Sequence, residues 1–274
     1  MSRGCITLLT DFGTVDPYVA AMKGAALSIN PDVRLVDISH EIAPQDIADA
    51  AFVLSGAFRN FPPGTVHVAV VDPGVGSERR ILAAEAEGQV LMAPDNGLLP
   101  AALGGAEPDR LVVVTNASFF RHPVSMTFHG RDILAPVAAH LTLGVGLSEL
   151  GHPVSDPVRL ESIAPEIGEA EIEGSVIHVD RFGNLVTNIP GSAVRELAAK
   201  GGGEPHVELA GTVIHRIHRA YAEVGVGQLL AVIGSTGRLE VSANRRSAAD
   251  LLGAGRRTTV RVSCASAWLH EQED

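Results

Sequence analysis

The sequence is poor in aromatic residues, in cysteine and in positive charge. Phe, Trp and Tyr make up 4% of its 274 residues, so aliphatic packing must build most of the core. The formal net charge of −11 argues against nucleic acid and anionic membranes as partners, because both are bound by clustered Lys and Arg. The two cysteines, Cys5 and Cys264, stand far apart and form neither a disulfide framework nor a cysteine-based zinc signature.

Long apolar runs are absent as well. No stretch approaches the roughly 20 residues that a membrane span requires. The first residues also lack the charged flank, apolar stretch and cleavage site of a secretory signal. We therefore expect a soluble cytoplasmic protein, whose 46% of apolar residues suffice for a sizeable core.

The first part of the chain, residues 1–152, alternates between aliphatic runs and helix-like stretches. Nearly continuous aliphatic runs are typical of strands that are covered on both faces. The alternation predicts an N-terminal three-layer α/β/α domain with a mostly parallel sheet. The expected strands are 5–10, 33–38, 66–71, 90–92 and 111–115, and the expected helices are 17–29, 44–59 and 131–143.

The pattern changes after this domain. Residues 153–170 combine prolines with Ser, Asp and Glu and show no periodicity, which predicts a linker. Residues 171–274 then carry short strands separated by turns, which predicts a small C-terminal β-barrel domain. We expect its strands at 175–179, 185–189, 207–209, 212–217, 229–233, 239–242 and 258–263, and one helix at 192–200.

Three carboxylates follow expected parallel strands of the first domain: Asp11, Asp72 and Asp95. Ligands of open parallel sheets bind outside the carboxyl ends of the strands, so these residues indicate a site. Asp72 is followed by a glycine-rich turn and then by Arg79. A strand-ending Asp and a surface arginine explain this segment equally well on spacing alone.

Other polar segments are ambiguous when taken singly. His129 precedes an expected helix, and a lone histidine is more often structural than catalytic. The turn at 180–188 reads first as a hairpin, although Phe182 beside Asn184 would suit an adenine ring and its polar edge. The segment 234–240 is, by itself, a turn followed by a strand.

Taken together and in order, five segments resemble the S-adenosyl-L-methionine hydroxide adenosyltransferase family, relatives of the enzymes that fluorinate or chlorinate the same substrate. Each segment is a weak signal alone, but the five occur in register and span nearly the whole chain. They are LLTDFG at 8–13, VDPGVG at 71–76, APDNGLL at 93–99, TFHGRD at 127–132 and DRFGN at 180–184.

The resemblance implies an enzyme that hydrolyses S-adenosyl-L-methionine to adenosine and methionine. It implies a homotrimer whose site lies between the first domain of one subunit and the second domain of its neighbour. No metal site is evident in the sequence, and we expect no cofactor, because S-adenosyl-L-methionine is the substrate. The catalytic set falls on Asp72, Arg79 and His129. The substrate contacts fall on Asp11 for the ribose, Phe182, Asn184, Tyr221 and the backbone near Arg245 for adenine, and Asp180, Ser235 and Glu240 for methionine.

In this reaction we expect Asp72 and His129 to hold a water molecule, while Arg79 stabilises its hydroxide character and keeps Asp72 ionised. Which residue accepts the proton stays open at this point. A halide-using enzyme is the nearest alternative, but a carboxylate beside a dehydrated anion would cost several kcal/mol. A non-enzymatic sensor of S-adenosyl-L-methionine or adenosine is the other alternative, and it leaves the Asp–Arg–His set without a task.

Overall fold

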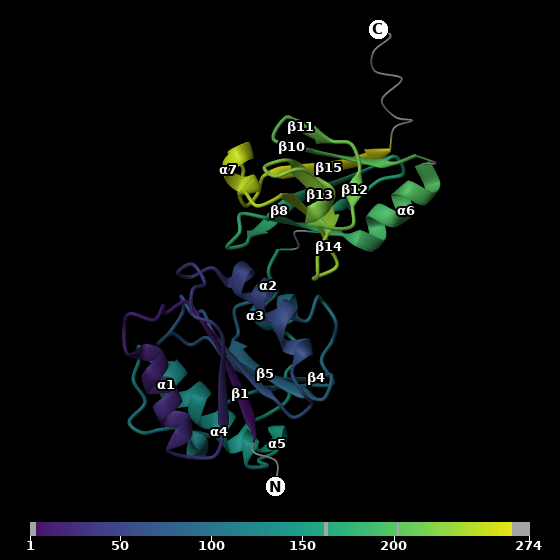
Figure 1. The fold of residues 1–274 in the computed structure, drawn as a ribbon. Coiled ribbons are helices and arrows are strands. Elements are labelled where there is room, and N and C mark those ends of the chain that lie inside the picture. The colour runs from purple at the N-terminus through teal and green to yellow at the C-terminus, as the bar shows by residue number, and fades with distance from the viewer. Residues whose placement is uncertain (1–3, 162–163, 202, 265–274) are drawn as a thin grey trace. The chain divides into compact units, whose positions relative to one another are not determined.

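The computed structural model describes residues 4–161, 164–201 and 203–264, and the chain divides into two compact units (Figure 1). The first unit is Met1–Glu161 and the second is Ser162–Asp274. Positions 162–163 of the expected linker and 265–274 of the expected barrel domain lie outside the described residues. The start of the linker belongs to the first unit, where Pro153 bridges to Val112.

The first unit is built on one sheet, whose described strands lie in the order β2-β1-β3-β5-β4-β6. Strands β2, β1, β3 and β5 are parallel, and β4 runs antiparallel to both β5 and β6. The predicted α/β class with a mostly parallel sheet is confirmed. The strand bounds are β1 Cys5–Thr10, β2 Arg34–Ser39, β3 Val66–Val70, β4 Ile81–Ala86, β5 Gln89–Pro94 and β6 Arg110–Val113.

Helices cover both faces of this sheet. Leu8 packs in a core cluster with residues of α1 (Tyr18–Leu27) and α4 (Ala135–Thr142). The next residue, Leu9, packs in a second cluster with α2 (Ile47–Ala57) and α3 (Leu98–Ala102). Because neighbouring strand residues point to opposite faces, the two clusters show three layers, which Figure 1 displays. The remaining helical segments are η1 Phe58–Asn60, η2 Ala117–Phe119, η3 Gly130–Leu134 and α5 Leu147–Leu150.

Strand β4 was not predicted from the sequence. Its residues include three alanines and a glutamate, which favour helix over strand. Tertiary pairing overrides this preference, because Ala86 and Gln89 pair across a two-residue loop. Both loop residues, Glu87 and Gly88, have positive φ, as tight hairpin turns require.

The strand ends position the candidate site. β1, β3 and β5 are adjacent and parallel and end at Thr10, Val70 and Pro94. The loops that carry Asp11 and Asp72 therefore leave the same edge of the sheet from neighbouring strands. This is the edge where ligands bind in sheets of this kind.

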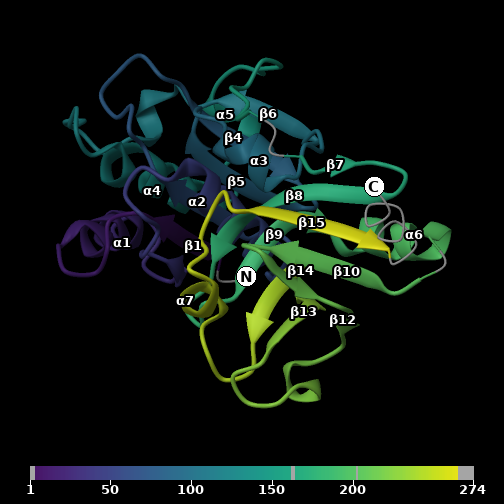
Figure 2. The same ribbon diagram turned by 90° about the horizontal axis from the view of Figure 1, so that it is seen from above.

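The second unit is a nearly closed, barrel-like sheet, so the predicted β-barrel is confirmed. Its path runs β11-β10-β15-β8-β9-β14-β13-β12 through the described residues, with β8 beside β15 in Figure 2. The predicted strand at 212–217 is divided into β11 and β12. The bounds are β7 Glu166–Ile167, β8 Glu171–Val179, β9 Leu185–Pro190, α6 Gly191–Gly201, β10 Pro205–Leu209, β11 Thr212–Ile214, β12 Ile217–His218, η4 Tyr221–Glu223, β13 Leu229–Ile233, β14 Arg238–Ala243, α7 Ala248–Leu252 and β15 Thr259–Cys264.

Candidate active site

Asp72, Arg79 and His129 meet at the carboxyl edge of the first unit's sheet. Arg79 Nε donates to both oxygens of Asp72, at 2.8 and 2.9 Å, and Nη2 also contacts Oδ2. The same Nη2 lies 2.8 Å from His129 Nδ1. The Asp72 and Arg79 side chains are only 5% and 11% exposed. Burial of this kind makes charge-assisted hydrogen bonds strong and directional.

A glycine at position 76 lets the two loops that carry these residues approach each other. Gly76 has a φ of +81°, in the left-handed region. A Cβ atom at this position would lie 2.3 Å from the backbone oxygen of Met126, in the loop that precedes His129. Only glycine combines a favourable left-handed backbone with the absence of a Cβ atom. Gly76 therefore allows the loop of Asp72 and Arg79 to lie against the loop of His129.

The contact with Arg79 determines the protonation of His129. A guanidinium has no acceptor atom, so Arg79 must donate and Nδ1 must accept. The ring is then neutral and carries its proton on Nε2. Burial lowers the pKa of His129 and the Arg79 charge lowers it further, while the charges of Asp72 and Asp132 oppose the shift. Geometry and electrostatics therefore agree on a neutral imidazole.

A cavity of about 420 Å³ lies beside two of the three side chains and is large enough for part of a nucleoside-sized ligand. Asp72 and His129 line it together with Asp11. An aromatic wall made of Phe12, Tyr18 and Phe128 also lines it; their rings meet edge-on or tilted at centroid distances of 5.4 to 6.0 Å.

Asp11 is oriented by a strained backbone. Gln45 donates its N–H to Asp11 Oδ2 at 2.8 Å, and Gln45 has a φ of +67°, which is unfavourable for a residue with a side chain. The next residue, Asp46, caps α2 by accepting from the N–H of Asp49 at 3.0 Å. The start of α2 thus aims a donor at Asp11 Oδ2, while Oδ1 has no hydrogen-bond partner in the described part of the chain and can accept from a ligand.

Asp95 does not line this cavity, although it follows the adjacent strand. Its buried carboxylate accepts from Arg80 Nε at 2.7 Å and from the N–H of Val158 at 2.8 Å. Arg80 also bonds Asp156 at 2.8 Å. Asp95 therefore attaches the start of the expected linker to the first unit and has a structural role.

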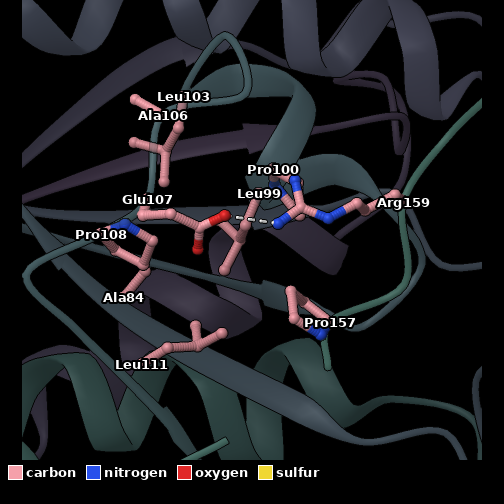
Figure 3. A pocket seen from close by; sticks show the side chains of 10 residues that line it. All are labelled: Ala84, Leu99, Pro100, Leu103, Ala106, Glu107, Pro108, Leu111, Pro157 and Arg159. Atoms are coloured by element: carbon pink, nitrogen blue, oxygen red, sulfur yellow. Dashed lines mark hydrogen bonds and ion pairs between the residues drawn. The ribbon is translucent and has the colours of Figure 1, made fainter. Parts of the chain in front are cut away.

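A second hollow in the first unit is apolar and small (Figure 3). It offers about 10 Å³, which is the space of a single water molecule. The ion pair of Glu107 and Arg159, at 2.7 Å, lies across it. It cannot hold a nucleoside, so the cavity beside Asp72 is the candidate active site.

The turn between β8 and β9 gathers three of the predicted substrate contacts. Asp180 accepts from the N–H groups of Phe182 and Asn184 at 2.8 and 2.9 Å, and from the Asn184 side-chain amide at 2.8 Å. Gly183, with a φ of +80°, passes so close to Ser247 that a Cβ would lie 2.1 Å from its Oγ. The backbone oxygen of Asn184 accepts from the N–H of Asp180 at 3.1 Å, while its side-chain oxygen has no partner among the described residues and can accept from a ligand. Phe182 is 77% exposed.

Glu240 lies near this turn, and its carboxylate is 3.4 Å from the hydroxyl of Tyr221. Burial raises the pKa of Glu240, and the charge of Asp180 raises it further. Burial, followed by the charge of Glu240, also raises the pKa of Tyr221. Ser235 and Arg245 lie on exposed turns at the two ends of β14. The structure therefore groups Asp180, Asn184, Tyr221 and Glu240 within the second unit.

The described residues hold no group of three or more His, Cys, Asp or Glu side chains arranged for a metal ion. In the same part of the chain, none of the helices has the length and apolar character needed to cross a membrane.

Two family models match the chain. Residues 6–151 match the N-terminal domain of the SAM hydroxide adenosyltransferases, and residues 174–261 match their C-terminal domain. This chain belongs to the SAM hydroxide adenosyltransferase family. The resemblance predicted from the sequence is therefore confirmed.

Relatives in the hydroxide adenosyltransferase family extend over nearly the full chain. An (R)-S-adenosyl-L-methionine hydrolase of Salinispora tropica is 39% identical over 264 residues, 94% of this chain and 97% of the relative. One of Thermus thermophilus is 38% identical, covering 94% and 98%. A fluorinase of Nocardia brasiliensis is 29% identical, covering 90% and 92%. A solved structure of an uncharacterized conserved protein from Thermotoga maritima superposes with a TM-score of 0.88 at 33% identity, covering 94% and 99%.

Within this adenosyltransferase fold, sequence reasoning missed part of the cavity wall. Phe12 and Phe128 belong to the segments 8–13 and 127–132, which resemble the family. Their positions beside Asp11 and His129 could have indicated that they line the cavity. Tyr18 was included only as part of an expected helix. Gln45 contributes only its backbone N–H, and the sequence does not indicate such a contact because every residue except proline carries this group.

Proposed function

We propose that the chain hydrolyses S-adenosyl-L-methionine to adenosine and L-methionine, by in-line attack of water on the ribose C5′ carbon. The observation that carries the proposal is the buried contact of Asp72, Arg79 and His129 at one cavity with Asp11. Membership of the family and the names of the hydrolase relatives support the same reaction.

Asp11 is suited to bind the ribose diol. Its Oδ2 is oriented by the Gln45 N–H, so the carboxylate presents a fixed pair of acceptors to two hydroxyl groups. The aromatic wall of Phe12, Tyr18 and Phe128 supplies apolar surface beside it. Binding the sugar here fixes C5′ within reach of Asp72, and such positioning supplies much of the rate of a displacement.

The second unit is suited to bind the two ends of the substrate. The exposed Phe182 ring offers a stacking surface for adenine, while Asn184, Tyr221 and the backbone at Arg245 offer polar contacts. Asp180, Ser235 and Glu240 would bind the methionine head group. A bound ammonium group would favour the ionised form of Glu240, whose pKa burial raises.

The protonation of the site assigns the roles in catalysis. His129 Nδ1 is occupied by Arg79, so His129 cannot take a proton there, but its Nε2–H can hold the water. Asp72 Oδ1 accepts one donor, Arg79 Nε, among the described residues and retains a lone pair for the water. As the oxygen bonds to C5′, the C5′–S electron pair passes to sulfur and the water's proton passes to Asp72. The nearby Arg79 charge stabilises the hydroxide character of the water.

The same charges disfavour halide as the nucleophile. A chloride or fluoride ion would stand beside the Asp72 carboxylate in a partly desolvated site, where like charges repel by several kcal/mol. The higher identity to the hydrolases, at 39% and 38%, than to the Nocardia brasiliensis fluorinase, at 29%, points the same way.

The proposal extends to assembly and setting. The chain acts as a homotrimer, and each site combines the first unit of one subunit with the second unit of its neighbour. No cofactor or metal takes part, because S-adenosyl-L-methionine carries its own leaving group. The protein works in the cytoplasm, a setting in keeping with the free thiols of Cys5 and Cys264.

Incubating the pure protein with S-adenosyl-L-methionine in ¹⁸O-labelled water, with and without added chloride, tests the function. We expect adenosine with ¹⁸O at the 5′ oxygen, detected by mass spectrometry, and no dependence on chloride. Formation of 5′-chloroadenosine would instead show a halide transferase. Intact substrate despite saturable binding would show a sensor.

A further inference from the structure

Asp132 has no task in the reaction described so far, yet its carboxylate is completely buried. Its side chain is 0% exposed, and it lies three residues after His129 in the π-helical turn η3. A buried carboxylate is costly unless it is paired and hydrogen-bonded, and π-helical turns occur frequently at functional sites. The contacts of Asp132 explain why the fold retains this charge.

The Asp132 side chain attaches the loop before His129 to the turn after it. Oδ2 accepts from the N–H of Ser125 at 2.9 Å, and Oδ1 accepts from Arg121 Nη1 at 3.3 Å. The backbone oxygen of Asp132 also accepts from the N–H of Arg121 at 2.8 Å. The N–H of Asp132 donates to the backbone oxygen of Phe128 at 3.2 Å, so the chain from Ser125 to Phe128 is held at both ends by one residue.

Asp132 also fixes the cavity wall through Arg131. Arg131 Nε and Nη2 donate to the two carboxylate oxygens at 2.7 and 2.8 Å, which sets the plane of the guanidinium. The Cζ atom of Arg131 lies 4.9 Å from the centre of the Phe128 ring. Cation–π contact of this kind holds Phe128 where it meets Phe12 and Tyr18 in the aromatic wall.

The charge of Asp132 reaches the imidazole as well. Arg79, Asp72 and Asp132 are the charged groups that affect His129, and the Asp132 anion raises the pKa of His129 against burial and Arg79. Replacing the anion with a neutral group removes this effect while it leaves the cations of Arg121 and Arg131 in place. The pKa of His129 would then fall further.

We infer that Asp132 is a positioning residue of the active site, which holds the His129 loop in register with Arg79 and fixes Arg131 beneath Phe128. The inference rests on the proposed function for its effect on turnover. Its structural part concerns the state of His129 and can be measured in the absence of any reaction.

The experiment compares Asp132→Asn with Asp95→Asn and the wild type. Asp95 is a matched control, because its carboxylate is also buried, at 3% exposure, and also accepts from an arginine and a backbone N–H. For Asp132→Asn we expect kcat to fall between about 10- and 100-fold, because the loop before His129 loses part of its attachment at Ser125 and Arg121. We expect the acid limb of the pH profile to move to lower pH, because Arg79 still contacts His129 while the Asp132 anion is gone. Asp95→Asn loses stability but keeps the acid limb of the wild type.

A second variant covers the case in which Asp132→Asn does not fold. Arg131→Gln removes a partly exposed side chain, so the fold is at less risk. We expect KM to rise several-fold because the Phe128 wall loosens, while kcat changes little. A folded Asp132→Asn with the kcat and acid limb of the wild type would overturn the inference, as would Arg131→Gln with an unchanged KM if Asp132→Asn is unfolded.

NMR of ¹⁵N-labelled histidine separates failure of this inference from failure of the proposed function. We expect His129 to titrate at lower pH in Asp132→Asn than in the wild type, whether or not either protein turns over. Adenosine formation by the wild type together with an unshifted His129 in the folded variant would reject the role of Asp132 alone. A shifted His129 in a protein that makes no adenosine would reject the reaction alone.

Discussion

The Asp72 carboxylate faces Arg79 on one side and the cavity on the other. Its pairing with a guanidinium that also engages His129 makes the three side chains one charge-assisted unit. Such a unit stabilises charge that develops in a transition state more than it stabilises a bound ground state. The catalytic role of each residue is therefore measured by comparing how much its substitution lowers turnover with how much it weakens binding.

The first prediction concerns Asp72→Asn. The amide cannot accept the water's proton as a carboxylate does, so we expect kcat to fall by about 10² to 10⁴-fold. Binding of adenosine, measured by calorimetry, should change by less than about threefold because the clamp residues remain. Glu78→Gln, an exposed carboxylate in the same turn, is the control. Equal losses of turnover and binding would contradict the role of Asp72.

The second prediction concerns pH. The pKa of His129 lies below its ordinary value of 6.5 because of burial and Arg79. Protonation at Nδ1 would break the contact with Arg79, so activity should be complete above pH 6.5 and fall as the pH drops through the lowered pKa. The profile of kcat/KM against pH measures this limb. A limb at or above pH 6.5 would show that Arg79 and His129 are not in contact in solution.

At the scale of elements, the strands β1, β3 and β5 were predictable because burial on both faces leaves a nearly continuous apolar run. Strand β4 was not, because its alanines favour a helix and only pairing with β5 and β6 makes it a strand. The split of the predicted strand at 212–217 likewise depends on tertiary pairing. Local preference identifies an element only where it agrees with the packing of the whole sheet.

The proximity of three candidate side chains was predictable, but the aromatic wall of the cavity and the protonation of the site were not. Resemblance placed Asp72, Arg79 and His129 in one set, and the loops bring them together. Which ring nitrogen of His129 accepts depends on the direction from which Arg79 arrives, and that is a property of the folded loops. The donor from Gln45 is a backbone group whose direction follows from its φ, so no side chain indicates it.

The third prediction tests this backbone donor at the start of α2. Gln45→Gly keeps the N–H and relieves the unfavourable φ of +67°, so we expect an unchanged KM and stability within about 1 kcal/mol of the wild type. Gln45→Pro removes the donor and cannot adopt that φ, so KM should rise about tenfold or more and the melting temperature should fall. Identical KM values for the two variants would show that Asp11 does not need this donor.

At the scale of the whole molecule, the proposed site needs residues from both units. Asp72 belongs to the first unit and Asn184 to the second. If neighbouring subunits share a site, two differently inactivated chains can complement each other. If each chain closes its own site, they cannot.

The fourth prediction uses this difference. Asp72→Asn and Asn184→Ala are each expected to be nearly inactive, and subunit exchange between them should restore activity in about a quarter of the sites. Light scattering should give the mass of a trimer for each variant and for the mixture. Absence of any recovery after verified exchange would place both units of a site in one chain.

The close approach of Gly76 to Met126 has a consequence for how this site can change. The loops of Arg79 and of His129 touch at a point with no room for a methyl group. Any side chain at position 76 would meet the backbone oxygen of Met126, so the loop that carries Arg79 and the loop that carries His129 would have to move apart. Neither loop can therefore be redesigned alone, and a new nucleophile would require both loops to be rebuilt at once.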